Sequence, residues 1–268
     1  MLEYIKALIL GVVEGITEWL PVSSTGHMIL VNEFIGNSGF TAQSLFLYVI
    51  QLGAILAVVT LYFRKLNPFS PSKSKAEKKG TWDMWFKVIA ACIPAGVIGL
   101  LFNDYMERFE NWQVVSATLI LYGIAFIIVE NMSKKEKVTE ISQMSYKTAL
   151  IIGLFQVLSI IPGTSRSGST ILGAMIVGAS RGLAAEFSFF LAIPIMFGVS
   201  FLKIVTYEGI LSLTDIGVLL FGMVCAYVVS LLAIKFLVNF VKKHDFKLFG
   251  WYRMALGLIV IAYFTLFK

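Results

Sequence analysis

Long hydrophobic runs, separated by short polar segments, extend along most of the chain. Six of these runs are close to or above the roughly 20 residues that a helix needs to cross a bilayer. They comprise residues 45–63, 88–103, 112–130, 184–206, 214–238 and 250–267. This pattern predicts an all-α polytopic membrane protein with six transmembrane helices.

Two further apolar stretches, residues 4–35 and 148–180, are interrupted by Pro, Gly, Ser and Thr. The interruptions fall at Pro21 to Gly26 and at Pro162 to Gly168. Non-helical backbone at membrane depth needs protein or water to satisfy its polar groups, so both breaks are expected to face an internal cavity. The two stretches are therefore predicted to form re-entrant helical hairpins.

Composition supports a membrane protein. Of the 268 residues, 58% are hydrophobic and 14% are charged, against about 45–50% and about 25% in soluble domains. The net charge of +6 does not indicate nucleic-acid binding, because the Lys and Arg residues gather in short loops between apolar runs. Cys92 and Cys225 lie inside apolar runs, so neither a disulfide framework nor a zinc site is expected. The first twenty residues lack the pattern of a cleavable signal peptide.

Basic residues in the connections predict the orientation of the helices. Residues 64–87, 131–147 and 239–249 are rich in Lys and are expected to be cytoplasmic. Residues 104–111 and 207–213 contain Glu and little Lys or Arg, so they are expected to lie outside. The hairpin of the first half then enters the membrane from the outside, and that of the second half from the inside.

Each hairpin is followed by three predicted crossings, and the two halves run in opposite senses. We therefore predict an inverted-topology repeat within a single membrane domain, residues 1–268. The first repeat covers about 1–130, a basic cytoplasmic linker about 131–147, and the second repeat about 148–268.

Sequence similarity between the halves supports this repeat. A shift of 142 residues brings Ala7-Leu-Ile-Leu-Gly11 onto Ala149-Leu-Ile-Ile-Gly153. The same shift aligns Glu14 with Gln156, Ser23 with Ser165, and Gly26 with Gly168. In membrane proteins built from such repeats, the ligand usually binds where the broken segments meet.

An arginine in apolar surroundings is the main chemical signal of the second hairpin. A permanent charge at membrane depth is costly, so Arg166 is expected to bind an anion. Ser165, Ser167 and Thr170 add hydroxyl donors, and a helix opening at 167–170 adds free amide groups. Arginine, hydroxyls and amides together fit phosphate oxygens. The alternative is a structural salt bridge from Arg166 to a glutamate of the first hairpin.

Glu14 and Glu18 are four residues apart, so a helix places both carboxylates on one face. Two such charges within lipid need a cation to neutralise them. A divalent cation fits, because Mg²⁺ favours one or two carboxylates together with phosphate oxygens and water. The alternative is that both side chains reach interfacial water near a helix end.

Ser23, Ser24, Thr25 and His27 follow the helix break at Pro21. A serine beside a histidine fits a nucleophile and its base, and His27 is itself a candidate nucleophile toward phosphorus. Ser23 and Ser24 also fit the N-cap of the next helix, which is compatible with catalysis. The spacing leaves Ser24, His27 and water open as the nucleophile.

Two segments resemble the signature motifs of the bacterial undecaprenyl-diphosphate phosphatases of the bacitracin-resistance type. They are Glu14-Gly-Ile-Thr-Glu-Trp-Leu-Pro-Val-Ser-Ser-Thr-Gly-His27 and Pro162-Gly-Thr-Ser-Arg-Ser-Gly-Ser-Thr170. The first segment fits the acidic pattern of Glu or Gln, three residues, then Glu. The second fits Pro-Gly-x-Ser-Arg-Ser-x-x-Thr without departure, and the resemblance covers essentially the full chain.

The resemblance implies an enzyme of the bacterial cell membrane that removes the terminal phosphate from undecaprenyl diphosphate and recycles the monophosphate carrier for cell-wall synthesis. It implies a site that opens to the outer face, a divalent cation (Mg²⁺ or Ca²⁺) and a homodimer. The roles carried over by position are metal binding by Glu14 and Glu18, chemistry at phosphorus by Ser24 or His27, and diphosphate binding by Arg166, Ser165 and Thr170. Ser23, Thr25 and Ser167 are further candidates for substrate binding.

The competing class is a transporter, because inverted repeats with paired broken segments are common in carriers. The same polar cavity fits a transporter or flippase of a phosphate-bearing lipid or anion. A carrier has no need of a His–Ser pair beside its anion site, so catalysis is favoured. The expected partners are a polyprenyl diphosphate lipid and the membrane lipids, and no nucleic acid.

Overall fold

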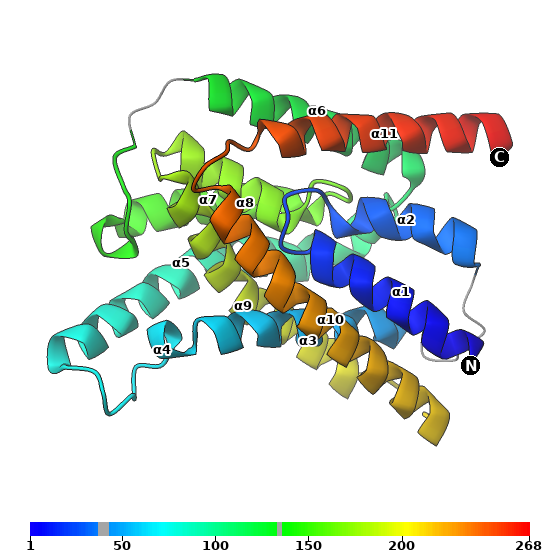
Figure 1. Ribbon diagram of the computed structural model, residues 1–268, viewed down its shortest axis with the longest axis horizontal. Helices are drawn as coiled ribbons and strands as arrows, with labels where there is room; N and C mark the ends of the chain where they lie inside the picture. Colours follow the sequence, from blue (N-terminus) through cyan, green and yellow to red (C-terminus); the bar gives the residue numbers. More distant parts are fainter. Residues whose placement is uncertain (37–42, 133–135) are drawn as a thin grey trace.

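The computed structural model describes residues 1–36, 43–132 and 136–268 and is built of helices (Figure 1). Its helices are α1 (Leu2–Thr17), α2 (Ser24–Ile35), α3 (Gln43–Leu61), α4 (Phe63–Leu66), α5 (Lys75–Glu107), α6 (Trp112–Asn131), η1 (Ile141–Gln143), α7 (Tyr146–Val157), η2 (Leu158–Ile160), α8 (Arg166–Ile176), α9 (Arg181–Val205), α10 (Leu213–Phe240) and α11 (Lys247–Phe267). Over these described residues, the one β pairing is an isolated bridge between Val138 and Ala179. The predicted all-α class is confirmed.

Five helices of the described part of the chain are long and apolar enough to cross a membrane, namely α5, α6, α9, α10 and α11. The bounds of α6, α9, α10 and α11 follow the hydrophobic runs closely, as for run 112–130 and α6, whereas α5 begins well before run 88–103. The prediction of a multi-pass membrane protein is therefore confirmed. The described apolar part of α3, Leu45–Leu61, is shorter than these five, so the sixth crossing stays a prediction.

The charge pattern predicted a loop over the basic segment 64–87. This prediction is wrong for the second half of the segment, because α5 already begins at Lys75. Ser74 and Glu77 cap this helix reciprocally. The Glu77 N–H donates to Ser74 Oγ (3.3 Å), and the Ser74 N–H donates to Glu77 Oε2 (2.7 Å). Such a capping box, followed by Lys, Ala and Glu of high helix propensity, starts a helix ahead of the apolar run.

Both interrupted stretches form a pair of contacting helices joined by a break, α1 with α2 and α7 with α8. The break of the first hairpin, between α1 and α2, comprises residues 18–23. That of the second hairpin, between η2 and α8, comprises residues 161–165. The predicted breaks extended too far toward the C-terminus, because Ser24 and Arg166 already begin the second helices. Ser24, Thr25, His27, Arg166 and Ser167 therefore project from the first turn of a helix and not from a loop.

The helix contacts have a two-fold pattern. Helices α1 and α3 pack against α10, while α7 and α9 pack against α5. In addition, α3 packs against α9 and α6 packs against α11, which lie alongside each other in Figure 1. The counterparts in the two halves are α1 and α7, α3 and α9, α5 and α10, and α6 and α11. Exchanging each helix with its counterpart reproduces these contact pairs. Helices α2 and α8 also correspond, because they begin 142 residues apart, the same shift that aligns the two halves of the sequence.

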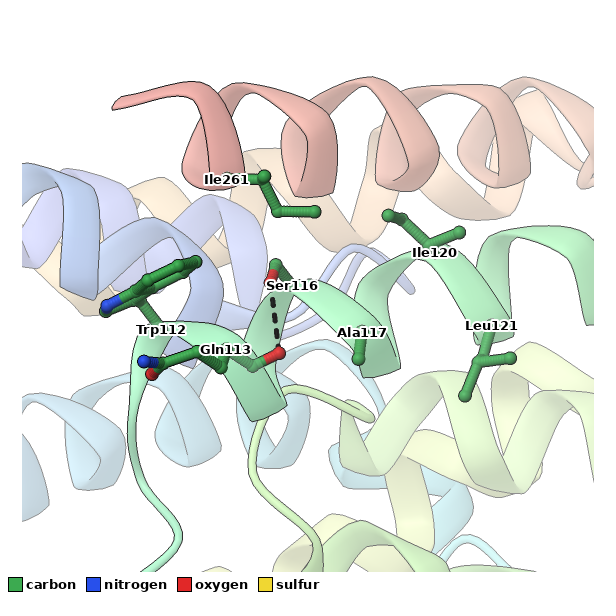
Figure 2. Close-up of a pocket in the computed structure, with 7 residues that line it drawn as sticks. All are labelled: Trp112, Gln113, Ser116, Ala117, Ile120, Leu121 and Ile261. Carbon is green, nitrogen blue, oxygen red and sulfur yellow. Dashed lines mark hydrogen bonds between the residues drawn. The ribbon is translucent and has the colours of Figure 1, made fainter. Parts of the chain in front are cut away.

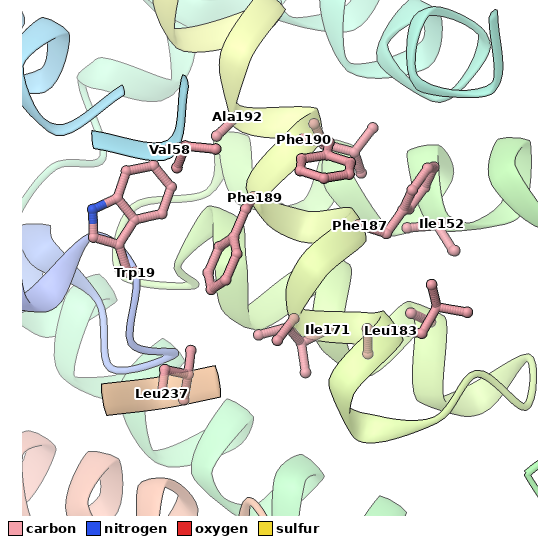
Figure 3. Close-up of a cluster of buried hydrophobic side chains, with 14 of the residues drawn as sticks. Trp19, Val58, Ile152, Ile171, Leu183, Phe187, Phe189, Phe190, Ala192 and Leu237 are labelled. Atoms are coloured by element: carbon pink, nitrogen blue, oxygen red, sulfur yellow. The ribbon is translucent and has the colours of Figure 1, made fainter. Parts of the chain in front are cut away.

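A cluster of large buried side chains supports the hairpin tips from one side (Figure 3). Trp19 lies in the first break and is fully buried, and its ring meets Phe189 of α9 edge-on at 5.5 Å between centroids. Phe187, Phe190 and Ile171 belong to the same cluster. Aromatic side chains bury large apolar areas, so this cluster anchors the break beside the polar motif residues.

Candidate active site

In each hairpin, a serine with an unusual backbone conformation immediately precedes the second helix. Ser23 and Ser165 both have φ of 72°, and in the described residues no other non-glycine residue has a positive φ. Each serine Oγ accepts a hydrogen bond from the backbone N–H three residues later, Gly26 at 3.3 Å and Gly168 at 3.1 Å. The capping role considered for Ser23 is confirmed, whereas Ser24 is the first residue of the helix.

Arg166 connects the second hairpin to the first. Its Nη2 donates to Glu18 Oε1 at 2.8 Å, and its Nη1 donates to the backbone oxygen of Ser188 at 2.7 Å. The Arg166 and Glu18 side chains are only 11% and 9% exposed. The guanidinium also lies 5.7 Å from the centroid of the Trp19 ring. The salt bridge that the sequence analysis considered for Arg166 is therefore present, and its partner is Glu18. The buried guanidinium of Arg166 lies where the two hairpins meet.

The serine hydroxyls add contacts across the same junction. Ser24 Oγ donates to Glu18 Oε2 at 3.3 Å. Ser167 Oγ lies within donating distance of the backbone oxygens of Glu18 (3.1 Å) and Leu20 (3.3 Å), and 3.1 Å from Ser165 Oγ. The structure thus brings together predicted site residues from both halves of the chain. The Ser24 hydroxyl is bonded to Glu18 and not to His27.

Thr170 lies behind Arg166 and is fully buried. Its Oγ1 is 2.7 Å from Ser188 Oγ and 3.0 Å from the backbone oxygen of Arg166. Ser188, on α9, contacts both residues but was missed by the sequence analysis, because it is a small polar residue within an apolar run and belongs to neither motif. Thr25 is half-buried in the first turn of α2, and its hydroxyl makes no hydrogen bond to any described residue.

Arg253 of α11 holds both breaks in place and was also missed. It is fully buried. Its Nη1 donates to the backbone oxygen of Pro21 (3.2 Å), and its Nη2 donates to those of Gly163 (2.9 Å) and Thr164 (3.0 Å). The sequence did contain a signal for Arg253, because a charged residue inside the apolar run 250–267 is unusual. The same kind of signal pointed to Arg166. Buried backbone oxygens need partners, and one guanidinium satisfies them on both hairpins.

His27 is held by two groups on either side of its ring. Nδ1 lies 2.7 Å from the backbone oxygen of Ser23, and Nε2 lies 2.7 Å from the hydroxyl of Tyr252 on α11. In the described part of the chain His27 makes no hydrogen bond to Ser24 or Arg166. Its ring is nevertheless tied to the break through Ser23, the residue next to Ser24.

Glu14 lies one helical turn before Glu18, whose N–H donates to the Glu14 backbone oxygen at 3.0 Å. The Glu14 side chain is 3% exposed, and its Oε1 has no hydrogen-bond partner among the described residues. No group of three or more His, Cys, Asp or Glu side chains that could hold a metal occurs in the described ranges. The two carboxylates, one with an unsatisfied oxygen, fit a divalent cation that completes its coordination with phosphate oxygens and water.

An open apolar groove of about 500 Å³ lies elsewhere, along α6 beside α11 (Figure 2). It is lined by Trp112, Gln113, Ser116, Ala117, Ile120, Leu121 and Ile261. No charged side chain and no motif residue is part of this lining. The groove therefore does not belong to the polar site at the hairpin tips.

Residues 7–259 match the family described as bacitracin resistance protein BacA. The chain belongs to this family. The match contains both signature segments, 14–27 and 162–170, and Arg253, so every residue of the site described above lies within the matched region.

Several relatives are similar over nearly their whole length, and each is named undecaprenyl-diphosphatase. The protein of Enterococcus faecalis is 58% identical over 265 residues, which cover 96% of each chain. That of Lactobacillus delbrueckii subsp. bulgaricus is 56% identical over 97% of each chain. That of Acetivibrio thermocellus is 55% identical over 98% of each chain.

Proposed function

We propose that this chain hydrolyses undecaprenyl diphosphate to undecaprenyl phosphate and inorganic phosphate. This reaction returns the lipid carrier to cell-wall synthesis and confers resistance to bacitracin. Membership of the BacA family and the names of the relatives support the proposal. The structural observation that carries it is the buried junction of the two hairpins, where Arg166 meets Glu18 among serine hydroxyls.

In this proposal Arg166 binds the diphosphate and offsets the charge that develops in the transition state. Ser165 and Ser167 donate hydrogen bonds from the first turn of α8, whose free amides favour an anion. Thr170, which contacts the Arg166 backbone and Ser188, keeps the arginine in place. Ser23 and Thr25 are the corresponding binding candidates of the first hairpin.

His27 and Ser24 serve at the terminal phosphorus. The nucleophile, either the Ser24 hydroxyl or a water molecule, loses its proton to His27 as its oxygen bonds to phosphorus. The bond to the bridging oxygen breaks, and the electron pair leaves with the monophosphate lipid. Glu18 orients the Ser24 hydroxyl through their 3.3 Å hydrogen bond. Attack by His27 itself is the alternative chemistry at the same position.

Glu14 and Glu18 are the residues that would hold a divalent cation, Mg²⁺ or Ca²⁺. The unsatisfied, buried Oε1 of Glu14 supports this assignment. Bound there, the cation supplies positive charge to the diphosphate oxygens. Glu18 also pairs with Arg166, so this carboxylate links the cation site to the phosphate site.

We further propose that the chain crosses the bacterial cell membrane six times, with α3 as the sixth crossing and α1–α2 and α7–α8 as re-entrant hairpins. The two-fold pattern of helix contacts and the matching caps at Ser23 and Ser165 support an inverted repeat of residues 1–130 and 148–268. As the resemblance to the phosphatase family implies, the site opens to the outer face. The homodimer implied by the resemblance stays a prediction.

Phosphate release from undecaprenyl diphosphate by the purified protein in detergent tests this function. We expect turnover with Mg²⁺ or Ca²⁺, none with a chelator, and none in Arg166→Ala or in the Glu14→Ala, Glu18→Ala double variant. Uptake of labelled lipid into vesicles without hydrolysis would instead identify a transporter. Full turnover in either variant would overturn the assigned roles.

A further inference from the structure

The contacts of His27 define which ring nitrogen carries the proton. The partner of Nδ1 is a backbone oxygen, that of Ser23, which can only accept, so Nδ1 must donate. In the neutral ring the one lone pair then lies on Nε2, and the Tyr252 hydroxyl donates to it at 2.7 Å. Tyr252 is thus the group that faces the only basic nitrogen of His27.

We infer that Tyr252 is the group through which His27 accepts a proton in the proposed phosphatase reaction, because the Ser23 oxygen sets the Nδ1–H tautomer and the Tyr252 hydroxyl occupies the one lone pair of Nε2. This inference rests on the proposed function. Neither signature motif contains Tyr252, which reaches His27 from α11, 225 residues away in the chain.

The surroundings of Tyr252 support this assignment. Its ring is nearly parallel to that of His27, at 9° and 5.6 Å between centroids. The next residue, Arg253, binds the backbone oxygen of Pro21 in the break that precedes Ser23. The same turn of α11 therefore fixes both the histidine ring and the backbone whose oxygen orients it.

The hydroxyl of Tyr252 suits both states of the histidine. Before reaction it donates to Nε2. When the nucleophile bonds to phosphorus, its proton passes to the Tyr252 oxygen while the Tyr252 proton moves along the 2.7 Å hydrogen bond to Nε2, and the bridging oxygen leaves with the electron pair of the broken bond. The imidazolium then donates from both nitrogens, to the Ser23 oxygen and to the Tyr252 oxygen, which turns from donor to acceptor.

The test uses Tyr252→Phe, which removes the hydroxyl and keeps the ring. The chain has two histidines, so His244→Asn leaves His27 as the single ¹⁵N-histidine signal. We expect the Nδ1–H tautomer in both proteins, because the Ser23 oxygen sets it, and a shifted Nε2 signal in Tyr252→Phe, because this nitrogen loses its hydrogen bond. We also expect kcat to fall roughly 10- to 100-fold, a part of the roughly 10²–10⁴-fold that a positioned base contributes, with KM almost unchanged.

Tyr263→Phe is the matched control, because it makes the same change on the same helix at a ring that contacts only Phe34, Phe264 and Phe267 in the described ring pairs. An Nε2–H tautomer in the parent, an unchanged kcat in Tyr252→Phe, or an equal loss in Tyr263→Phe would overturn the role of Tyr252. Absence of phosphate release from the wild type would overturn the proposed function as well. Normal wild-type turnover with any of the first three results would overturn the inference alone.

Discussion

Arg166 and Glu18, 148 residues apart in the chain, form a buried ion pair that joins the two hairpins. Both side chains are largely desolvated, so removing one partner leaves the other as an uncompensated buried charge, which destabilises the fold. Under the proposed function, a diphosphate that enters the site would bring its own negative charge to the guanidinium. The pair with Glu18 would then compensate the charge of Arg166 until the substrate binds.

We predict strong coupling between these two residues. Arg166→Gln and Glu18→Gln each leave one buried charge without its partner, which costs about 3–5 kcal/mol. The double variant removes both charges and is expected to be more stable than the two single losses together imply. Thermal unfolding in detergent over the four proteins measures this, and additive losses would contradict the pairing. Phosphate release is expected to fall at least about 100-fold in every variant.

Arg253 is expected to be the more important arginine for stability. Arg253→Gln leaves the backbone oxygens of Pro21, Gly163 and Thr164 without their shared donor, and each unsatisfied buried group costs about 1–3 kcal/mol. Thermal unfolding in detergent is expected to occur at a clearly lower temperature, and turnover is lost with it. Arg64→Gln, at an exposed position, is the control. Equal unfolding temperatures for the two variants would show that Arg253 does not hold the breaks.

The cation assignment predicts a specific effect of Glu14→Gln. The amide keeps the size of the side chain but removes the charge and weakens one metal ligand. We expect the Mg²⁺ or Ca²⁺ concentration for half-maximal phosphate release to rise about 10-fold or more. Glu208→Gln, an exposed glutamate on the α9–α10 connection, should leave the metal titration unchanged. An unaltered titration in Glu14→Gln would remove this residue from the cation site.

Close helix packing predicts a different kind of variant. A side chain at Gly153 of α7 would collide with the backbone of Ala91 on α5, whereas one at Gly96 of α5 would meet open space. Gly153→Val must push the two helices apart and is expected to lower the unfolding temperature strongly, because small residues allow this approach. Gly96→Val is the matched control. Similar unfolding temperatures would mean that the α5–α7 contact is not tight.

The sequence predicted the helices well and the contacts between them poorly, for a physical reason. Hydrophobic period and length define a crossing locally, so run 112–130 and α6 nearly coincide. The pairing of Arg166 with Glu18 was open between two glutamates, and Arg253 was overlooked. Its partner Pro21 is 232 residues away, and a bond between one side chain and a distant backbone oxygen leaves no pattern in either segment.

The two serines with positive φ allow stability and activity to be separated. A non-glycine residue in this conformation costs on the order of 1–3 kcal/mol, which glycine avoids. Ser165→Gly loses the cap to Gly168 N–H, at a cost of a few tenths of a kcal/mol, but relieves the backbone. We therefore expect it to be at least as stable as the wild type, whereas Ser165→Ala loses the cap and keeps the strain, and should be less stable by about 1 kcal/mol.

Both variants lack the hydroxyl that the proposed function assigns to phosphate binding, so both should release phosphate more slowly than the wild type. Thermal unfolding and phosphate release measured side by side then distinguish two roles of one serine. A stable Ser165→Gly protein with full turnover would show that the hydroxyl serves the helix cap alone. A slow but stable Ser165→Gly protein would show that the strained backbone is retained because it places this hydroxyl beside Ser167 and Arg166 at the junction of the hairpins.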